Sequence, residues 1–421
     1  MKTKRFFSIL LALCLAAGMA FTAGVSANAL AVVPAGYVTI SVDANVLGTG
    51  AGVLYGPALV PFYAGESLMN ITDRFLADNC DGSVTAYGFF LNGVKLPRNI
   101  TVAVPSVISD AVPDFTAAGG HTQAGEFLAS GDFAGWAGWM YTLGNETLYD
   151  GADAVAAADG AVLRWQYSLA VGNDLGFEDW MGSPGLIPLT DRDALAVAAA
   201  QVNSAPNKAQ LLADAPTLAA YNTAMGILSD LLAAQTDIDT AAAALNAAAL
   251  AAARTLRLAA ITAVATGLVE ADYTAASWAA LQTAITAAKT AVNSAGTVTA
   301  VNAVAVPSAS QLVTKLTEAK NAKLAALSAV TNGLSEADYT AESWDALQAE
   351  ITAAKKAVND AATVAAVNLV TVPTAAGLEL TCLAKWQAKL PDWLSGVIKL
   401  PNWVQWIVMI VGFGWIWWLF R

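Results

Sequence analysis

The N-terminal part of the chain alternates short apolar segments with glycine-rich loops. Residues 38–42 alternate apolar and polar side chains with a period of two, which predicts a half-buried β-strand. Residues 161–169 show the same period. Their two predicted faces are Leu163, Trp165 and Tyr167 on one side, and Arg164, Gln166 and Ser168 on the other. Further strands are predicted at residues 59–63, 85–91 and 139–143.

One predicted helix interrupts these strands. Apolar residues recur at helical spacing between Leu68 and Leu76, and Ser67 stands where an N-cap residue is expected. A single helix packed on a small mixed sheet is the simplest arrangement of these elements. The sequence therefore predicts an α+β head domain over residues 35–179.

After residue 190 the pattern changes to long alanine-rich segments with a helical period. Residues 268–278 (LVEADYTAASW) recur as residues 334–344 (LSEADYTAESW), so that each position has an equivalent 66 residues further along the chain. The repeat predicts a degenerate helical module over residues 190–254 and two full copies over residues 255–320 and 321–386.

Each copy predicts a bundle of three helices. The first ends near Gly267 or Gly333, where glycine suits a left-handed C-terminal cap. The second has one apolar face in both copies, formed by Trp278, Leu281, Ile285, Ala288 and Val292, and by Trp344, Leu347, Ile351, Ala354 and Val358. The third begins after Pro307 or Pro373. Residues 240–266 and 311–332 contain neither glycine nor proline, so consecutive copies share continuous helices, which predicts a stiff, all-α stalk.

Both ends of the chain carry targeting signals. Residues 1–29 have the basic start, apolar core and small residues of a signal peptide, with cleavage after Ala27 or Ala29. Residues 387–421 contain LPDWL and LPNWV, followed by an apolar stretch over residues 403–420. We expect this tail to anchor the protein in a membrane, either as a C-terminal hydrophobic helix that spans it or as a segment in its interface. The expected anchor residues are Trp403, Trp406, Trp415, Trp417, Trp418 and Arg421.

Charge and reactive side chains narrow the function. The formal net charge is −12 and no basic patch carries interleaved aromatics, so nucleic-acid binding is not expected. Cys14, Cys80 and Cys382 are too dispersed for a disulfide framework, and His121, the single histidine, does not make a zinc site by itself. No catalytic motif is found, which predicts a non-enzymatic protein without cofactor or metal.

Three segments of the head carry a family resemblance: GES at residues 65–67, GWAGWMY at residues 135–141 and DGAVLRWQY at residues 159–167. They resemble a domain of unknown function that is common in surface proteins of Gram-positive bacteria. That domain is similar to the C-terminal domain of the vitamin-B12 carrier transcobalamin, and the resemblance implies a β-grasp-like fold. Either Trp136, Trp139 and Tyr141 then form an aromatic platform for a sugar or corrin-like ring, or Trp139 and Trp165 fill the core of the sheet. Trp136, in a glycine-rich turn, is the one we expect to be exposed.

The helical copies resemble the FIVAR repeat of Gram-positive surface proteins. The shared element is DYTxxSW, at residues 272–278 and 338–344, followed by spaced leucine, isoleucine and alanine–lysine positions. The resemblance implies a three-helix module that spaces other domains from the cell and has been suspected of sugar binding. The apolar, β-branched residues 298–306 and 364–372 depart from this pattern.

Two functions follow from the sequence. The first is an exported, membrane-anchored cell-surface protein that displays a small interaction or adhesion domain on a helical stalk, towards a glycan, a host or a neighbouring cell. The second is surface capture of a small ligand, a cobalamin-like cofactor or a glycan, by the N-terminal domain.

Overall fold

A computed structural model describes residues 33–85, 88–116, 126–148, 150–178, 182–381 and 385. The predicted signal peptide (residues 1–29), Cys14, His121, Cys382 and the predicted membrane tail (residues 387–421) lie outside these residues. The chain divides into two compact units. The first consists of Met1–Thr266 and Ala284–Pro307, and the second consists of Gly267–Thr283 and Ser308–Arg421.

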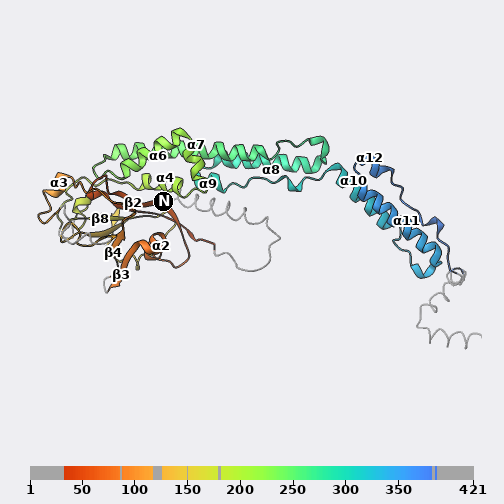
Figure 1. The fold of residues 1–421 in the computed structure, drawn as a ribbon, viewed down its shortest axis with the longest axis horizontal. Coiled ribbons are helices and arrows are strands. Elements are labelled where there is room, and N and C mark those ends of the chain that lie inside the picture. Colours follow the sequence, from red (N-terminus) through yellow and green to blue (C-terminus); the bar gives the residue numbers. More distant parts are fainter. Residues whose placement is uncertain are drawn as a thin grey trace, which may run out of the picture. The chain divides into compact units, whose positions relative to one another are not determined.

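The first unit is built on a mixed β-sheet with the strand order β2-β1-β8-β6-β7 (Figure 1). Its strands are β1 (Gly36–Ala44), β2 (Gly52–Phe62), β6 (Gly138–Leu143), β7 (Glu146–Thr147) and β8 (Val162–Ser168). β1 pairs antiparallel with β2 and parallel with β8, and β8 pairs antiparallel with β6. The mixed α+β class is therefore confirmed, as are strands at the predicted positions, although β2 begins seven residues earlier than residue 59.

Helix α2 (Leu68–Leu76) covers one face of this sheet. It begins at the predicted N-cap, because Ser67 and Asn70 form a reciprocal capping box. The helix buries Leu68 and Ile71 against the apolar side chains of β1 and β8. Trp165 of β8 donates its indole N–H to the Thr72 hydroxyl at 2.9 Å, which satisfies the one polar atom of that ring inside the core.

A second, smaller sheet has the order β3-β4-β5. Its strands are β3 (Cys80–Thr85), β4 (Gly88–Lys95) and β5 (Phe127–Ala129), and the short helix α3 (Ser106–Ser109) lies between β4 and β5 in the chain. The single strand predicted at residues 85–91 is wrong: β3 ends at Thr85 and β4 begins at Gly88, antiparallel to it. Gly88 has a φ of +101°, a backbone conformation that glycine adopts without steric cost and that reverses the chain there.

The polar face of the main sheet is also buried, because helix α4 (Asp193–Asn203) packs on β1, β2 and β8. Six polar side chains on this face are at most 5% exposed: Thr39, Ser41, Asp43, Arg164, Gln166 and Ser168. The prediction that β1 and β8 are half-buried, in a sheet covered by one helix, is therefore wrong. The alternation is real, but the alanine-rich α4 brings a second layer onto the polar face.

The remaining helices of the first unit continue from α4. They are α5 (Lys208–Ala213), α6 (Ala215–Leu228), α7 (Gln235–Ala263), α9 (Val298–Ala303) and the later part of α8 (Ala275–Ser294). Helix α7 packs on α4 and α6, and α9 packs on α7. The boundary predicted between a head (residues 35–179) and a helical module (residues 190–254) therefore falls inside one compact unit.

The second unit contains a bundle of α10 (Lys315–Ala329), α11 (Ala341–Asp360) and α12 (Val364–Leu369). Leu327, Val358 and Val367 form its buried core, one from each helix. The short α12 precedes Pro373 and was not predicted. The helix predicted after Pro307 is confirmed, because α10 begins at Lys315. Its predicted equivalent after Pro373 lies largely outside the described residues, which end at Thr381 apart from Lys385.

The β-branched segments without a predicted structure, residues 298–306 and 364–372, have the same conformation in both copies. Each begins with an N-capping threonine, Thr297 or Thr363, whose hydroxyl accepts from the backbone N–H three residues on. A six-residue helix follows and then extended chain. Short 3₁₀ turns occupy Asn45–Leu47, Ala77–Asn79, Asn173–Leu175, Glu270–Asp272, Ala309–Gln311, Glu336–Asp338 and Ala375–Gly377.

Candidate functional site

The three aromatic residues proposed as a ligand platform do not share one surface. Trp139 and Tyr141 alternate along β6, so they lie on the same side of the sheet, and both are only 8% exposed. The Trp139 indole donates to the Leu128 carbonyl at 2.9 Å, and Tyr141 packs on Trp165 with ring centroids 5.1 Å apart. Burial, with help from the nearby Asp150 and Asp153, raises the pKa of Tyr141 to about 12. Both residues belong to the core, and the three-residue platform is not assembled.

Trp136, by contrast, is 79% exposed. It lies in the loop between β5 and β6, next to the exposed Gly135. The residues on either side of this pair, Ala134 and Ala137, are buried. The indole is therefore presented by a loop whose neighbouring positions are fixed in the core.

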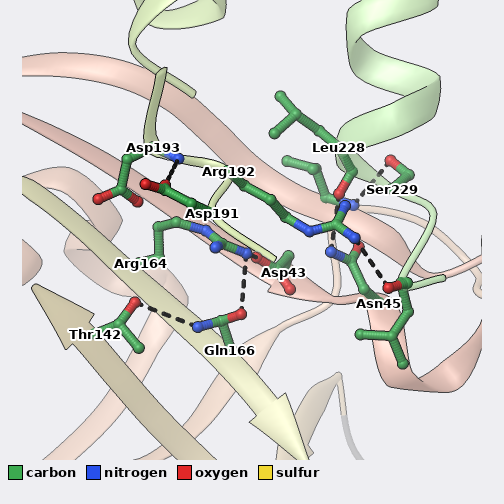
Figure 2. Close-up of polar contacts among 12 residues, drawn as sticks. Asp43, Asn45, Thr142, Arg164, Gln166, Asp191, Arg192, Asp193, Leu228 and Ser229 are labelled. Atoms are coloured by element: carbon green, nitrogen blue, oxygen red, sulfur yellow. Dashed lines mark hydrogen bonds and ion pairs between the residues drawn. The ribbon is translucent and has the colours of Figure 1, made fainter. Parts of the chain in front are cut away.

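A buried group of charged and amide side chains lies between the sheet and the helices; we call it the polar cluster and define it as Asp43, Asn45, Arg164, Gln166 and Arg192 (Figure 2). Arg164 forms an ion pair with Asp43, with Nη2 and Oδ2 3.3 Å apart, and donates to the Gln166 amide oxygen at 2.9 Å. All five side chains are at most 5% exposed. A buried charge needs such a partner, because transfer from water is costly.

Arg192 and Asn45 connect the polar cluster to the end of α6. Arg192 donates to the carbonyls of Ile227 and Leu231, and Asn45 donates to the carbonyl of Leu228 at 2.8 Å. The last carbonyls of a helix have no partner within the helix and carry partial negative charge. Through Asn45, in the turn that follows β1, and through Arg192, just before α4, the cluster thus holds the C-terminal end of α6 against the sheet.

Burial shifts the pKa values in this region. It lowers the pKa of Arg192 to about 10, with a further lowering from the Arg164 charge and partial compensation from Asp43. It raises the pKa of Asp43, against the opposing effect of Arg164 and Arg192. Burial also raises the pKa of Asp193 to about 6, where Arg164 opposes the shift and Asp191 adds to it.

A small pocket borders the polar cluster. Its polar lining comes from Asn45, Asn145, Arg164, Gln166, Thr190 and Arg192. The side-chain oxygens of Asn45 and Asn145 have no hydrogen-bond partner among the described residues. The free space is about that of one water molecule, so the pocket suits a structural water that bridges these oxygens rather than an organic substrate.

Each helical copy contains a stacked tyrosine–tryptophan pair. Tyr273 and Trp278 have ring centroids 6.0 Å apart and an interplanar angle of 15°, and Tyr339 and Trp344 repeat this at 5.9 Å and 11°. All four side chains are half-buried. Next to each pair, the N–H of Thr274 or Thr340 donates to a carbonyl of the extended segment, that of Val313 or Glu379. These backbone hydrogen bonds hold the start of each helix against that segment, next to the stacked rings.

Other candidate chemistry is sparse in the described residues. They hold no group of three or more histidine, cysteine, aspartate or glutamate side chains that would bind a metal ion. Cys80 is partly buried, and burial together with nearby aspartates raises the pKa of its thiol, which opposes thiolate reactivity. Among the described residues, helix α7 is long and apolar enough to cross a membrane, judged by length and composition alone. It buries Ile238, Leu245 and Ala249, whereas most of its apolar stretch is not buried.

Comparison with known proteins yields no further assignment. No protein-family model, no curated protein and no solved structure matches the chain.

The polar cluster is the feature that the sequence did not reveal. Its residues come from three distant segments, and the sequence placed Arg164 and Gln166 only on the face opposite Trp165, without indicating what covers that face. The available signal was the composition of Thr39, Ser41 and Asp43, which are short polar side chains suited to close packing by a helix. The expected membrane-anchor residues lie outside the described residues, so they remain predictions.

Proposed function

We propose that the protein is an exported, membrane-anchored cell-surface protein that displays an α+β interaction domain on a helical stalk. The observation that carries this proposal is the repetition of contacts, not only of sequence, between the helical copies. Arg257 donates to the carbonyl of Asn302, and 66 residues on Lys323 donates to that of Asn368. Modules that repeat their internal contacts are typical of proteins that extend a chain by stacking similar units.

The strand order supports a β-grasp-like assignment for the head. A β1–β2 hairpin is followed by helix α2, and the last long strand, β8, enters the sheet parallel to β1 at its centre. β6 then lies outside β8. This is the arrangement that the resemblance to the transcobalamin C-terminal domain implies. The smaller β3-β4-β5 sheet is an insertion between α2 and β6.

The polar cluster supports a mechanical role for the first helices. Arg192 and Asn45 bind the end of α6, so the head does not depend on a flexible linker to join it to the first helical segment. A displayed domain benefits from this connection, because a rigid attachment keeps its binding surface directed away from the cell. Residues 1–29 and 387–421 supply the proposed export signal and membrane anchor.

Protease shaving of intact producing cells tests this proposal. We expect peptides from residues 35–386 to be released, while peptides from residue 387 onward stay with the membrane fraction in mass spectrometry. A truncated protein that ends at residue 386 is the matched control and is expected in the medium. Recovery of the intact full-length protein from the medium would reject the membrane anchor.

The alternative, capture of a small ligand by the head, is favoured by the exposure of Trp136. A corrin-like ring is the less suitable ligand. It needs a broad apolar surface, whereas Trp139 and Tyr141 are buried and the pocket beside the polar cluster has room for about one water molecule. A glycan, which a single aromatic ring can contact, fits the exposed surface better.

A further inference from the structure

The loop that carries Trp136 is held by several hydrogen bonds to the sheet and within itself. The Asp132 carboxylate accepts from the Ala129 N–H at 2.8 Å, and the Gly131 N–H donates to the Ala137 carbonyl at 2.8 Å. The Tyr167 hydroxyl of β8 lies within hydrogen-bonding distance of two carbonyl oxygens and donates to them, that of Ala129 at 2.8 Å and that of Asp132 at 2.7 Å. These contacts fix both ends of the loop to the sheet.

The same loop contains backbone strain. Phe133 has a φ of +71°, a conformation that a bulky residue rarely adopts, while its ring is buried. Such strain persists only where the surrounding structure holds it, and it is concentrated at binding and catalytic sites. Here it turns the chain so that Phe133 enters the core and Trp136 leaves it. A rigid loop with an exposed indole loses little entropy when a ligand stacks on that ring.

An acidic side chain contacts the residue that precedes Trp136. The Asp114 carboxylate accepts the Gly135 N–H through Oδ2 at 2.7 Å, and Asp114 is itself exposed. Residue 135 suits glycine, because a Cβ there would lie 2.9 Å from the Asp114 Oδ2 atom. Asp114, from the segment after α3, therefore holds the loop next to Trp136, and its carboxylate is an exposed acceptor one residue away from the aromatic side chain in that loop.

These two groups select a class of ligand. A carboxylate accepts hydrogen bonds from hydroxyl groups, and the negative face of an indole attracts the C–H groups of a flat, weakly polar ring. A pyranose sugar provides both. Anionic glycans and anionic lipid surfaces are disfavoured by Asp114, by the exposed Asp110 and by the formal net charge of −12. The residues on either side of Trp136 in the chain, Gly135 and Ala137, have no large apolar side chain that would extend the indole into a protein-binding patch, which favours a small ring as the ligand.

We propose that the loop around Trp136 is a binding site for a neutral glycan, with the indole stacked on one pyranose ring and Asp114 accepting its hydroxyl hydrogens. The proposal gives a ligand class to the displayed domain and in that sense rests on the proposed function. Its test does not, because binding by the purified protein is independent of how the protein is attached to the cell.

The experiment uses the purified full-length chain in a polyoxyethylene detergent, which has no sugar headgroup to compete. The probes are immobilised neutral oligosaccharides that end in glucose, galactose, mannose or N-acetylglucosamine, together with sialylated and sulfated counterparts. We expect binding to at least one neutral glycan and weaker binding to its charged counterparts. Trp136→Ala is expected to weaken that binding roughly tenfold, the order of one lost stacking contact.

Three further variants separate stacking from folding. Trp136→Phe keeps an aromatic face and is expected to retain most of the affinity. Phe90→Ala removes another half-exposed aromatic residue, on β4, and is expected to bind like the unmodified protein. Asp114→Asn keeps an oxygen for the Gly135 N–H but removes the charge, and it is expected to reduce the discrimination against charged glycans. Thermal melting monitored by circular dichroism checks that each variant is folded.

Three results would overturn the proposal: no binding to any neutral glycan at millimolar concentration, unchanged binding by Trp136→Ala, or a preference for the charged glycans. Attachment to glycosidase-treated cells that depends on Trp136 would identify a protein ligand instead and would also reject it. None of these results changes the outcome of protease shaving, so the two proposals fail separately.

Discussion

Arg164 and Asp43 pair across two parallel strands, with Nη2 and Oδ2 3.3 Å apart and both side chains buried beneath helix α4. Arg192 immediately precedes α4 and lies close to both side chains. Its charge acts to lower the pKa of Asp43, and the charge of Arg164 in turn acts to lower the pKa of Arg192. The ion pair is therefore enclosed by residues of the head and of the first helical segment. It follows that these two parts of the chain stabilise each other.

Removal of one partner of this ion pair is expected to be strongly destabilising. Arg164→Met leaves the Asp43 carboxylate buried without its partner, and we expect the free energy of unfolding to fall by about 3–5 kcal/mol. The double variant Asp43→Leu/Arg164→Met removes both charges and is expected to recover most of that loss. Urea denaturation followed by tryptophan fluorescence measures both. Additive effects of Asp43→Leu and Arg164→Met would show that the two side chains do not interact energetically.

Stability is expected to depend on pH through Asp193. Burial raises the pKa of this carboxyl from its ordinary value of 3.8 to about 6, so the folded protein binds the proton more tightly than the unfolded chain does. The stability that this protonation contributes is complete below pH 3.8 and is lost as the pH rises through about 6. As the pH rises from 3.8 to about 6, the unmodified protein should therefore lose stability relative to Asp193→Asn.

The measurement for Asp193 is the difference in urea midpoint between the two proteins at a series of pH values. Other carboxyl groups with raised pKa values, such as Asp43, are present in both proteins, so their contribution largely cancels in the difference. A difference that stays constant across this range would mean that Asp193 titrates normally in the fold.

The two tryptophans near β6 are expected to respond in opposite ways to truncation. Trp139→Ala removes a buried ring and leaves the Leu128 carbonyl without its donor, which should cost about 3–5 kcal/mol of stability. Trp136→Ala removes a ring that is largely in solvent and should change stability by less than about 0.5 kcal/mol. Thermal unfolding by calorimetry compares them. Equal losses would show that Trp136 is packed in the folded protein.

The turn before α11 is expected to require glycine at residue 333, because the backbone there has a positive φ. Gly333 has a φ of +77°, and no atom lies within 4 Å of the position that a Cβ would take. Gly333→Ala should therefore cost about 1–2 kcal/mol from backbone strain alone, and Gly333→Asn should cost less. Gly377 in the same unit has an equally open position and no positive φ, so Gly377→Ala is the matched control. Similar effects of both alanine substitutions on the melting temperature would contradict the strain argument.

Local patterns were sufficient to predict most elements of the fold. The period of two at residues 38–42 and 161–169 located β1 and β8, and Ser67 located the start of α2. The repeat of 66 residues located α8 and α11, whose predicted apolar positions Leu281 and Leu347 are both buried. The periodicity and the capping signal depend on side chains within a few residues of one another, and the repeat is a comparison of two sequence segments, so all of them can be recognised without the tertiary structure.

Two kinds of feature were missed. The first is local: the short helices α9 and α12, which precede Pro307 and Pro373, were not predicted, because the N-capping role of Thr297 and Thr363 was not recognised. The second concerns contacts between distant segments. The aromatic platform was predicted from three residues that are close in sequence. Alternation along β6 turns Trp139 and Tyr141 into the core, and only the strained loop keeps Trp136 outside it.

The sequence by itself determined the α+β and helical character of the successive regions, the repeat and the acidic charge. Only the tertiary structure decided which face of the main sheet is covered, and by what. The sequence of β8 alternates in the same way whether the face with Arg164 meets water or helix α4. Periodicity shows that the two faces of a strand differ, but it does not show what packs against each face. The partner of that face, Arg192 with α4, comes from a segment further along the chain, and its position is fixed by packing.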